Sequence, residues 1–488
     1  MSVQDFPNLL FALLLPWVTG IVWVRLGWRR GVAGRPFAVI GYGFFVGWGL
    51  LVLVMLGLEA LGLNQGVIRT TVPLLLLTVL GLLLTRWVDL APISQTQGPH
   101  GWRSLAMTEK WAVAVLLALL ALRFGTLLTE VLIRPLYPWD AWMNWAPKAR
   151  VWFEHQWLVP FVSRNDWMAG GSDAGFYTMG NWDHPPAVPL IQLWVAMVAG
   201  RWDDALINLP WWFLGVAMVM AVYGQARAAG FSPVMGLVGA YLLVSLPLVS
   251  THIALAGYAD LWIGGWMLLG TFSLYLWALQ GNLRQAPFVL VAAIALPLFK
   301  TPGLIWGMIL VAVLLVARLR LRTLVWLAVG ALVALGVIVL TIGVDIELPR
   351  VGRIVLGRDA IVLPYMRGSG VTMHPVWGAV AGHMQVLGTW HLLWYLAAIV
   401  VLAGAWLSLV DRGVRAVWMV LVLGMAFLFI VFFMTDKYSD AVDGQTLNRA
   451  LLHVAPVVVI LGLILQEKLC GLLRSPLHRA RTVRTEKS

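Results

Sequence analysis

Residues 110–145 read KWAVAVLLALLALRFGTLLTEVLIRPLYPWDAWMNW, and they combine the two features that decide the fold. The first part, 110–133, is an apolar stretch longer than the roughly 20 residues that an α-helix needs to cross a membrane. The second part begins at Arg134 and is aromatic and polar, with Asp140 between Trp139 and Trp142. The stretch therefore predicts a transmembrane helix that leads directly into a structured loop at the membrane surface.

The composition extends this prediction to the whole chain of 488 residues. Hydrophobic residues make up 61% of it and charged residues only 11%, against about 25% charged residues in soluble domains. These values predict an all-α polytopic membrane protein and exclude soluble enzymes, secreted disulfide scaffolds and disordered chains. The single cysteine, Cys470, excludes an intrachain disulfide and a cysteine-based metal site. The net charge of +12 does not indicate nucleic acid, because in a membrane protein the basic residues set the topology.

About 13 transmembrane helices are expected, near 8–26, 36–60, 70–88, 110–133, 205–224, 233–251, 261–280, 286–299, 303–317, 323–343, 391–410, 415–434 and 450–466. One set of loops then carries 20 of the 34 lysines and arginines, whereas the opposite side carries 17 of the 22 acids. Basic loops remain in the cytoplasm. We therefore expect a multi-pass protein of the cell inner (plasma) membrane, with the N-terminus outside and the C-terminus cytoplasmic.

The segments divide the chain into three accessory helices in 1–90, a transmembrane core in 104–466 and a basic cytoplasmic tail in 467–488. Two extracytoplasmic loops of the core, 134–204 and 344–390, are too long to be simple connectors. The stretch 186–200 is apolar but short, and it is interpreted as an interfacial helix that places Trp194 and Trp202 at headgroup depth.

Three ionisable residues lie in apolar or aromatic surroundings. Asp140 is a candidate general base if the aromatic loop partly buries it, and a hydrated loop aspartate is the alternative. Asp260 is the one charged residue between Arg227 and Arg284, and an ionisable group at membrane depth is usually functional. Lys300 lies at the tip of a short apolar hairpin, where a lipid phosphate would neutralise it, unless the lysine snorkels to the surface.

The tryptophans of the first loop fit an interfacial aromatic belt. Trp142 and Trp145 have a second interpretation, because they lie between Asp140 and Lys148. There they could stack on sugar rings.

The first loop resembles that of GT-C glycosyltransferases, closest to the protein O-mannosyltransferases and the lipid A aminoarabinose transferases. The matching elements are Asp140, Lys148-Ala149-Arg150, Trp157-Leu158-Val159-Pro160 and His184-Pro185-Pro186, followed in order by Asp260, Lys300-Thr301-Pro302, and Asn448-Arg449 to His453-Pro456. The resemblance covers roughly residues 104 to 466. Two features depart from the families. Asp140-Ala141 stands where an Asp-Glu pair is common, and Ala187-Val188 replaces the glycine and lysine that follow His-Pro-Pro in the protein mannosyltransferases.

The resemblance implies a GT-C-like fold and the transfer of a sugar from a polyprenyl-phosphate carrier, such as undecaprenyl phosphate, to an acceptor hydroxyl of a lipid, glycan or protein. Asp140 would be the base of a single inverting displacement. Asp260, Lys300, Arg449, His453, Lys148, His184, Trp142 and Trp145 would bind substrate, with Lys300 and Arg449 next to the phosphate. Arg350, Arg353, Arg358 and Arg367 of the second loop are a reserve of cations, and lipid headgroups would explain them equally well.

No cofactor is required by this reaction. Asp203-Asp204 is a weak candidate for a divalent metal, and capping of the next helix is the alternative. Two other functions stay open. A polymerase or ligase of lipid-linked glycans would not need Asp140. A transporter or flippase should show inverted repeats and charges inside its spans, where Arg123 is the only deep one.

Overall fold

The computed structural model describes residues 5–88, 104–348, 352–358, 360–362, 364 and 372–485, with side chains up to Leu469. The longer helices are α1 (Asp5–Val24), α2 (Arg35–Ala60), α3 (Val67–Trp87), α4 (Met107–Ile133), α7 (Ala187–Ala199), α8 (Leu209–Ala228), α9 (Pro233–Ser245), α10 (Pro247–Ala254), α11 (Asp260–Gln280), α12 (Ala286–Phe299), α13 (Gly303–Val316), α14 (Leu321–Thr341), α16 (Leu393–Ser408), α17 (Arg412–Met434) and α19 (Gln445–Thr485). Short helices in the loops are α5 (Ala146–His155), α6 (Arg164–Asp166), α15 (Trp377–Ala381) and α18 (Tyr438–Val442), and a π-helical turn, η3, covers Ala141–Trp145. The chain is therefore mostly helical, as the composition predicts.

Nine helices in the described ranges are long and apolar enough to cross a membrane. The pair α9 and α10 would make a tenth span, bent by 67°. The bend departs from the continuous segment expected at 233–251, and it follows from Pro247, since the residue before a proline disfavours helical geometry. Shorter apolar helices α12, α13 and α16 coincide with three further predicted segments. The membrane architecture is thus confirmed, and the total of 13 spans stays a prediction.

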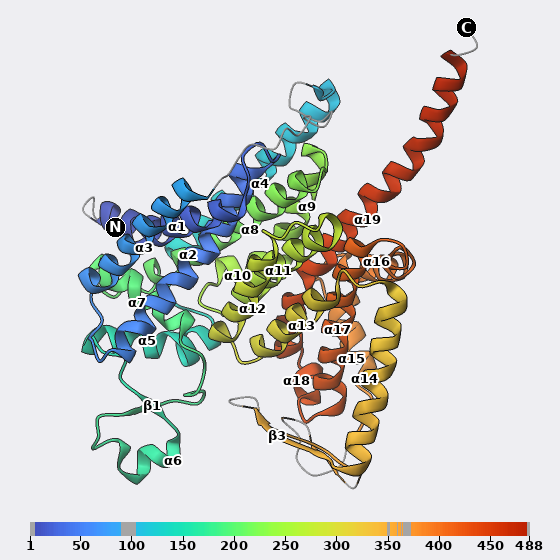
Figure 1. Cartoon of the computed structure of the whole chain (residues 1–488). Helices are drawn as coiled ribbons and strands as arrows, with labels where there is room; N and C mark the ends of the chain where they lie inside the picture. Colours follow the sequence, from blue (N-terminus) through green and yellow to red (C-terminus); the bar gives the residue numbers. More distant parts are fainter. Residues whose placement is uncertain are drawn as a thin grey trace.

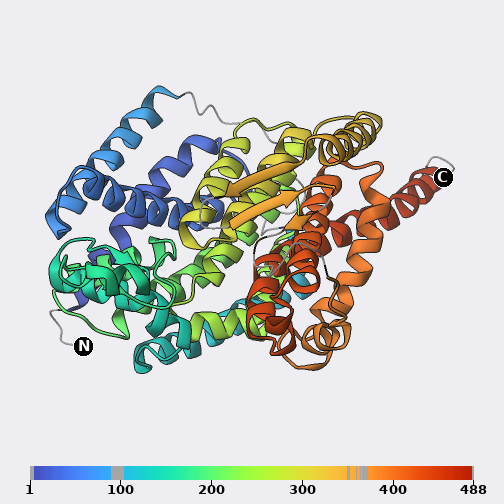
Figure 2. The same ribbon diagram turned by 90° about the horizontal axis from the view of Figure 1, so that it is seen from below.

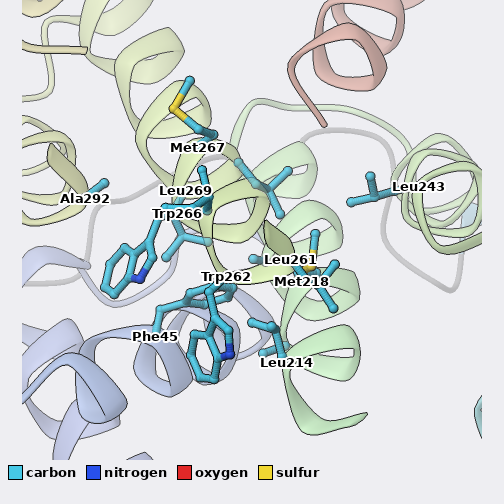
Figure 3. Packing of buried hydrophobic residues seen from close by; sticks show 14 of the residues in the cluster. Phe45, Leu214, Met218, Leu243, Leu261, Trp262, Trp266, Met267, Leu269 and Ala292 are labelled. Atoms are coloured by element: carbon cyan, nitrogen blue, oxygen red, sulfur yellow. The ribbon is translucent and has the colours of Figure 1, made fainter. Parts of the chain in front are cut away.

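Helix α11 forms the centre of the bundle. Trp262 and Trp266 on its first two turns are buried and contact the ring of Phe45 from α2 (Figure 3). Both also contact the ring of Phe299 from α12. Leu214 and Met218 of α8 lie on another side of the same helix (Figure 3). Aromatic and aliphatic packing therefore fixes α11, and with it the acidic residue at its first position, Asp260.

The three N-terminal helices pack on this core. Between α1 and α2 the backbones approach so closely that a Cβ at Gly47 would lie 1.8 Å from the carbonyl oxygen of Pro16. Small residues permit such close crossings, which hold membrane helices together by van der Waals contact. Helix α2 then packs against α8, where a Cβ at Gly224 would lie 2.1 Å from the amide nitrogen of Ala38.

Both long loops leave the same end of the bundle. Figure 1 shows β1 (Phe161–Val162) and α6 at the bottom left and β3 (Val344–Leu348) at the bottom right, whereas the end of α19 projects upward. Strand β1 pairs in parallel with β2 (Tyr177–Thr178). In the second loop, β3, β4 (Gly352–Leu356) and β5 (Ile361–Val362) form an antiparallel sheet, with Val344 opposite Leu356 (Figure 2).

Helix α7 differs from its prediction as an interfacial helix. Trp194 is 0% exposed, and its indole Nε1 donates to the carbonyl oxygen of Ala12 in α1 at 2.8 Å. The placement of Trp194 among headgroups is therefore wrong, because α1, α2 and α5 cover the helix. Trp202 stays partly exposed, with the guanidinium of Arg150 at 5.4 Å from its ring centroid.

Candidate functional site

Asp140 lies at the end of the bundle from which the loops emerge, directly before the π-helical turn η3. Its Oδ1 accepts a hydrogen bond from Asn144 Nδ2 at 3.0 Å, and its Oδ2 accepts one from Arg449 Nη1. Arg449 belongs to α19, 309 residues further along the chain, and its guanidinium lies 5.5 Å from the ring centroid of Tyr258. Asp140, Asn144 and Arg449 together form what we call the Asp140 centre.

A second carboxylate lies deeper, at the start of α11. Asp260 is 1% exposed, and its Oδ1 accepts hydrogen bonds from Lys300 Nζ at 2.6 Å and from His453 Nε2 at 2.9 Å. Trp306 of α13 donates its indole N–H to His453 Nδ1 at 3.1 Å. Because an indole N–H can only donate, His453 must accept at Nδ1 and carry its proton on Nε2. Asp260, Lys300, His453 and Trp306 form the Asp260 centre.

The two centres meet around Tyr258 and His184. Tyr258 interacts electrostatically with Arg449, Asp140 and Asp260, and its partial burial raises its pKa. His184 has its pKa lowered to about 4, first by burial and then by the positive charges of Lys300 and Lys148. His184 is therefore neutral at pH 7 and adds no charge to the two carboxylate–cation pairs, Asp140–Arg449 and Asp260–Lys300.

An apolar cavity of about 250 Å³ opens beside the Asp260 centre. Asp260, Lys300 and His453 line its polar end, and its apolar wall comes mainly from residues 427–432 of α17. Ile354 of β4 and Pro364 also line it, so the second loop covers this cavity. A ligand there would combine a polar group at the ion pairs with an apolar chain along α17.

Two buried polar atoms at these centres have no hydrogen-bond partner among the described residues, Asp260 Oδ2 and Arg449 Nε. One is an acceptor and the other a donor. Buried groups of this kind are rare without a partner, so they point to a ligand that supplies a hydroxyl or ammonium proton to one and an anionic oxygen to the other.

Three of the expected substrate-binding side chains already have partners within the protein. Trp145 is 1% exposed and packs against the ring of His184 at 4.8 Å between centroids, so it supports the loop and offers no free face to a sugar. Lys148 is 3% exposed, and its Nζ donates to the carbonyl oxygens of Trp182 at 2.7 Å and His184 at 2.9 Å. In His453 both ring nitrogens bond to protein groups, which makes it a positioning residue at the wall of the cavity. The side chains of Trp145 and Lys148 are thus enclosed by protein contacts, and His453 lines the cavity with its ring nitrogens occupied, none of which a sequence shows.

Trp142 keeps an exposed face, at 43%, with its ring edge against Trp139. In the second loop, Arg353 is paired with Asp345 across the β3–β4 hairpin, and Arg358 lies beyond the end of β4. Arg350 and Arg367 lie outside the described residues.

The carboxylates proposed for a metal have local roles. Asp203 Oδ1 accepts from the backbone amides of Ala205 and Leu206, which is the capping alternative, and Asp204 Oδ1 accepts from the indole of Trp202. Within the ranges that the structure describes, no three His, Cys, Asp or Glu side chains group as metal ligands.

Three residues of the site are absent from the sequence-based prediction, namely Asn144, Tyr258 and Trp306. Asn144 had a signal, since it follows Asp140 by four residues and so lies one helical turn away. Tyr258 and Trp306 are single aromatic residues in largely aliphatic segments, and nothing in their local pattern distinguishes them. Comparison of the chain with protein-family models, with curated proteins and with solved structures finds no match.

Proposed function

We propose that this protein is a GT-C-like membrane glycosyltransferase that moves a sugar from a polyprenyl-phosphate carrier to an acceptor hydroxyl outside the cytoplasm. The observation that carries the proposal is the meeting of two carboxylate–cation pairs, Asp140–Arg449 and Asp260–Lys300, next to an apolar cavity under the second loop. A lipid-linked sugar has the matching parts: a long apolar chain, a phosphate and a hydroxylated ring.

In the proposed reaction, Asp140 accepts the proton of the acceptor hydroxyl while that oxygen attacks the anomeric carbon. The bond from this carbon to the phosphate oxygen breaks, and the carrier leaves as a phosphate monoester with inversion at the sugar. Asp140 is suited to this role by its position, since its side chain is 17% exposed and can meet an acceptor that arrives from outside. Its contact with Arg449 must loosen when the acceptor binds.

The developing negative charge on the phosphate needs cations. Lys300 is 16% exposed at the polar end of the cavity, and Arg449 has a buried Nε that is free to donate. Each cation is held near the reaction by a carboxylate until the phosphate binds. Asp260 Oδ2 is then the natural acceptor for a sugar hydroxyl, and it orients the ring.

The test compares lipids and envelope glycans by mass spectrometry in cells with and without the gene. The proposal expects one sugar-modified species to disappear and its polyprenyl-phosphate sugar donor to accumulate. A transporter or flippase would leave the modification chemistry intact in extracts supplied with donor and acceptor. A polymerase or ligase would change glycan length in place of a single sugar, and either result would overturn the proposal.

The side of the membrane is tested by labelling. In a Cys470→Ser background, Ser172→Cys should react with an impermeant thiol reagent added outside, and Ser475→Cys should not. Ser172 is exposed in the first loop, so its reactivity reports topology and not burial. The opposite pattern would place Asp140 in the cytoplasm and would make nucleotide sugars the plausible donors.

A further inference from the structure

A second pair of cavities begins at the other end of helices α11 and α12, and no residue of the Asp140 centre or the Asp260 centre lines either of them. An apolar groove of about 460 Å³ runs between the end of α1, the middle of α2 and the length of α12. A polar cavity of about 450 Å³ lies next to it, at the last turn of α11 and the residues that follow it. Both volumes are in the range of ligand sites. Gly27 and Arg284 line both cavities, so the two meet there.

The groove has the length of one lipid chain in one leaflet. Along α12 its lining extends from Pro287 to Leu298, which is about 16 Å at 1.5 Å per residue. Half of the hydrocarbon core of a bilayer is about 15 Å thick. Ile294 on its rim is 65% exposed and Val291 is 38% exposed, so the groove is open to the surrounding lipid along its side.

The polar cavity has the chemistry of an anion site. Arg29 and Arg284 line it, and no acidic side chain is among the described residues that line either cavity. Trp28, also in its lining, is 2% exposed, and its indole Nε1 has no hydrogen-bond partner in the part of the chain that the structure describes. A phosphate oxygen would satisfy this donor, and two guanidinium groups would neutralise its charge.

From these features we infer a binding site for an anionic phospholipid, with the phosphate between Arg29, Arg284 and the indole of Trp28 and one acyl chain in the groove along α12. The site is independent of the proposed glycosyl transfer. Its phosphate end lies at the last turn of α11, 20 residues or about 30 Å from Asp260, and therefore at the opposite side of the membrane from the candidate site. The inner leaflet, which the basic loops predict for this end, is the one rich in anionic lipids.

The experiment uses the full chain reconstituted in phosphatidylcholine vesicles that contain a minor fraction of phosphatidylglycerol. After mild extraction, native mass spectrometry counts the lipids retained by each protein molecule. We expect the wild-type protein to keep one phosphatidylglycerol in preference to phosphatidylcholine. Arg29→Gln and Arg284→Gln should each weaken retention about tenfold, as expected for loss of one charge-assisted hydrogen bond.

Two controls separate this site from general lipid contact. Arg322→Gln removes a basic residue of α14 that lines neither cavity and should leave retention unchanged. Ile294→Trp fills the groove and should abolish retention, whereas Leu290→Trp, on the same helix but outside the lining, should not. Because Ile294 and Arg29 are exposed, these variants do not depend on refolding of the core. Equal retention of both lipids by the wild-type protein, or equal loss in Leu290→Trp and Ile294→Trp, would overturn the inference.

Discussion

The two carboxylate centres at the loop end of the bundle differ in burial, although each pairs an aspartate with a cation. Asp140 lies in the first loop, directly before the turn η3. Its side chain is 17% exposed, and that of its partner Arg449 is 19% exposed. Asp260 begins the most buried helix, is 1% exposed, and bonds to both Lys300 and His453. The difference assigns them different tasks. A group that exchanges protons with an arriving acceptor must be accessible, whereas a group that is enclosed by its partners is suited to hold the site in place.

The largest expected effect is on turnover, at Asp140. Asp140→Asn keeps the size of the side chain and one oxygen that can accept from Arg449, but it removes the base, so turnover should fall by about 10² to 10⁴. Assays of sugar transfer by the purified protein measure this loss, and the melting temperature should change little. Asp166→Asn, in the same loop and exposed, is the matched control. Near-wild-type transfer by Asp140→Asn would remove Asp140 from the mechanism.

The second effect is on stability, at Asp260. Asp260→Ala leaves Lys300 and His453 without their acceptor, and breaking a buried ion pair costs about 3 to 5 kcal/mol of unfolding free energy. Denaturant unfolding in detergent measures it. The exposed pair of Asp345 and Arg353 provides the control, since Asp345→Ala should have little or no effect. If both alanine variants lose the same unfolding free energy, the buried Asp260–Lys300 pair contributes no more to stability than the exposed Asp345–Arg353 pair.

Asp260→Asn sharpens the same contrast through activity. The amide keeps an oxygen for Lys300 and His453, so more of the fold should survive than in Asp260→Ala. Its loss of turnover should be smaller than that of Asp140→Asn, because Asp260 orients the substrate and does not take its proton. A larger loss would reverse the two assignments.

The third effect is on donor binding, at Lys300. One charge-assisted hydrogen bond to a phosphate corresponds to about a tenfold to hundredfold change in affinity. Lys300→Ala should therefore weaken donor binding by that factor and lower turnover as well. Lys300→Arg should rescue only in part, since a planar guanidinium does not replace a compact ammonium in a tight hairpin. If Lys300→Gln binds the donor within about twofold of wild type, the lysine has no part in phosphate binding.

The sequence predicts the membrane fold well because apolar length alone determines which segments can span a bilayer. It also singles out Asp140, Asp260, Lys300 and Arg449 as candidates, since charges are rare in such a chain and each one stands out. It does not predict their pairing, because Asp140 and Arg449 are 309 residues apart and meet only in the folded chain. The sequence also does not show which side chains are buried, because burial too depends on segments that are distant in the chain. Lys148 and Trp145 look like ligand-binding residues until α7 and the loop close around them.

The smallest expected effect concerns His184, which lies between the two centres. Its pKa of about 4 in the folded protein is below the value of about 6.5 in an unfolded chain, because burial and the charges of Lys300 and Lys148 oppose protonation. The unfolded state therefore binds more protons between pH 6.5 and 4, and the wild-type protein should lose stability as the pH falls through this window. At pH 5 the loss is at most about 2 kcal/mol, and water at the partly exposed ring reduces it. Melting temperatures of the wild type and of His184→Gln, measured at pH 7.5 and pH 5, give the comparison. The wild type should lose more between the two values, because glutamine does not titrate. Equal losses would mean that His184 is solvated and that the charges of Lys300 and Lys148 do not reach it.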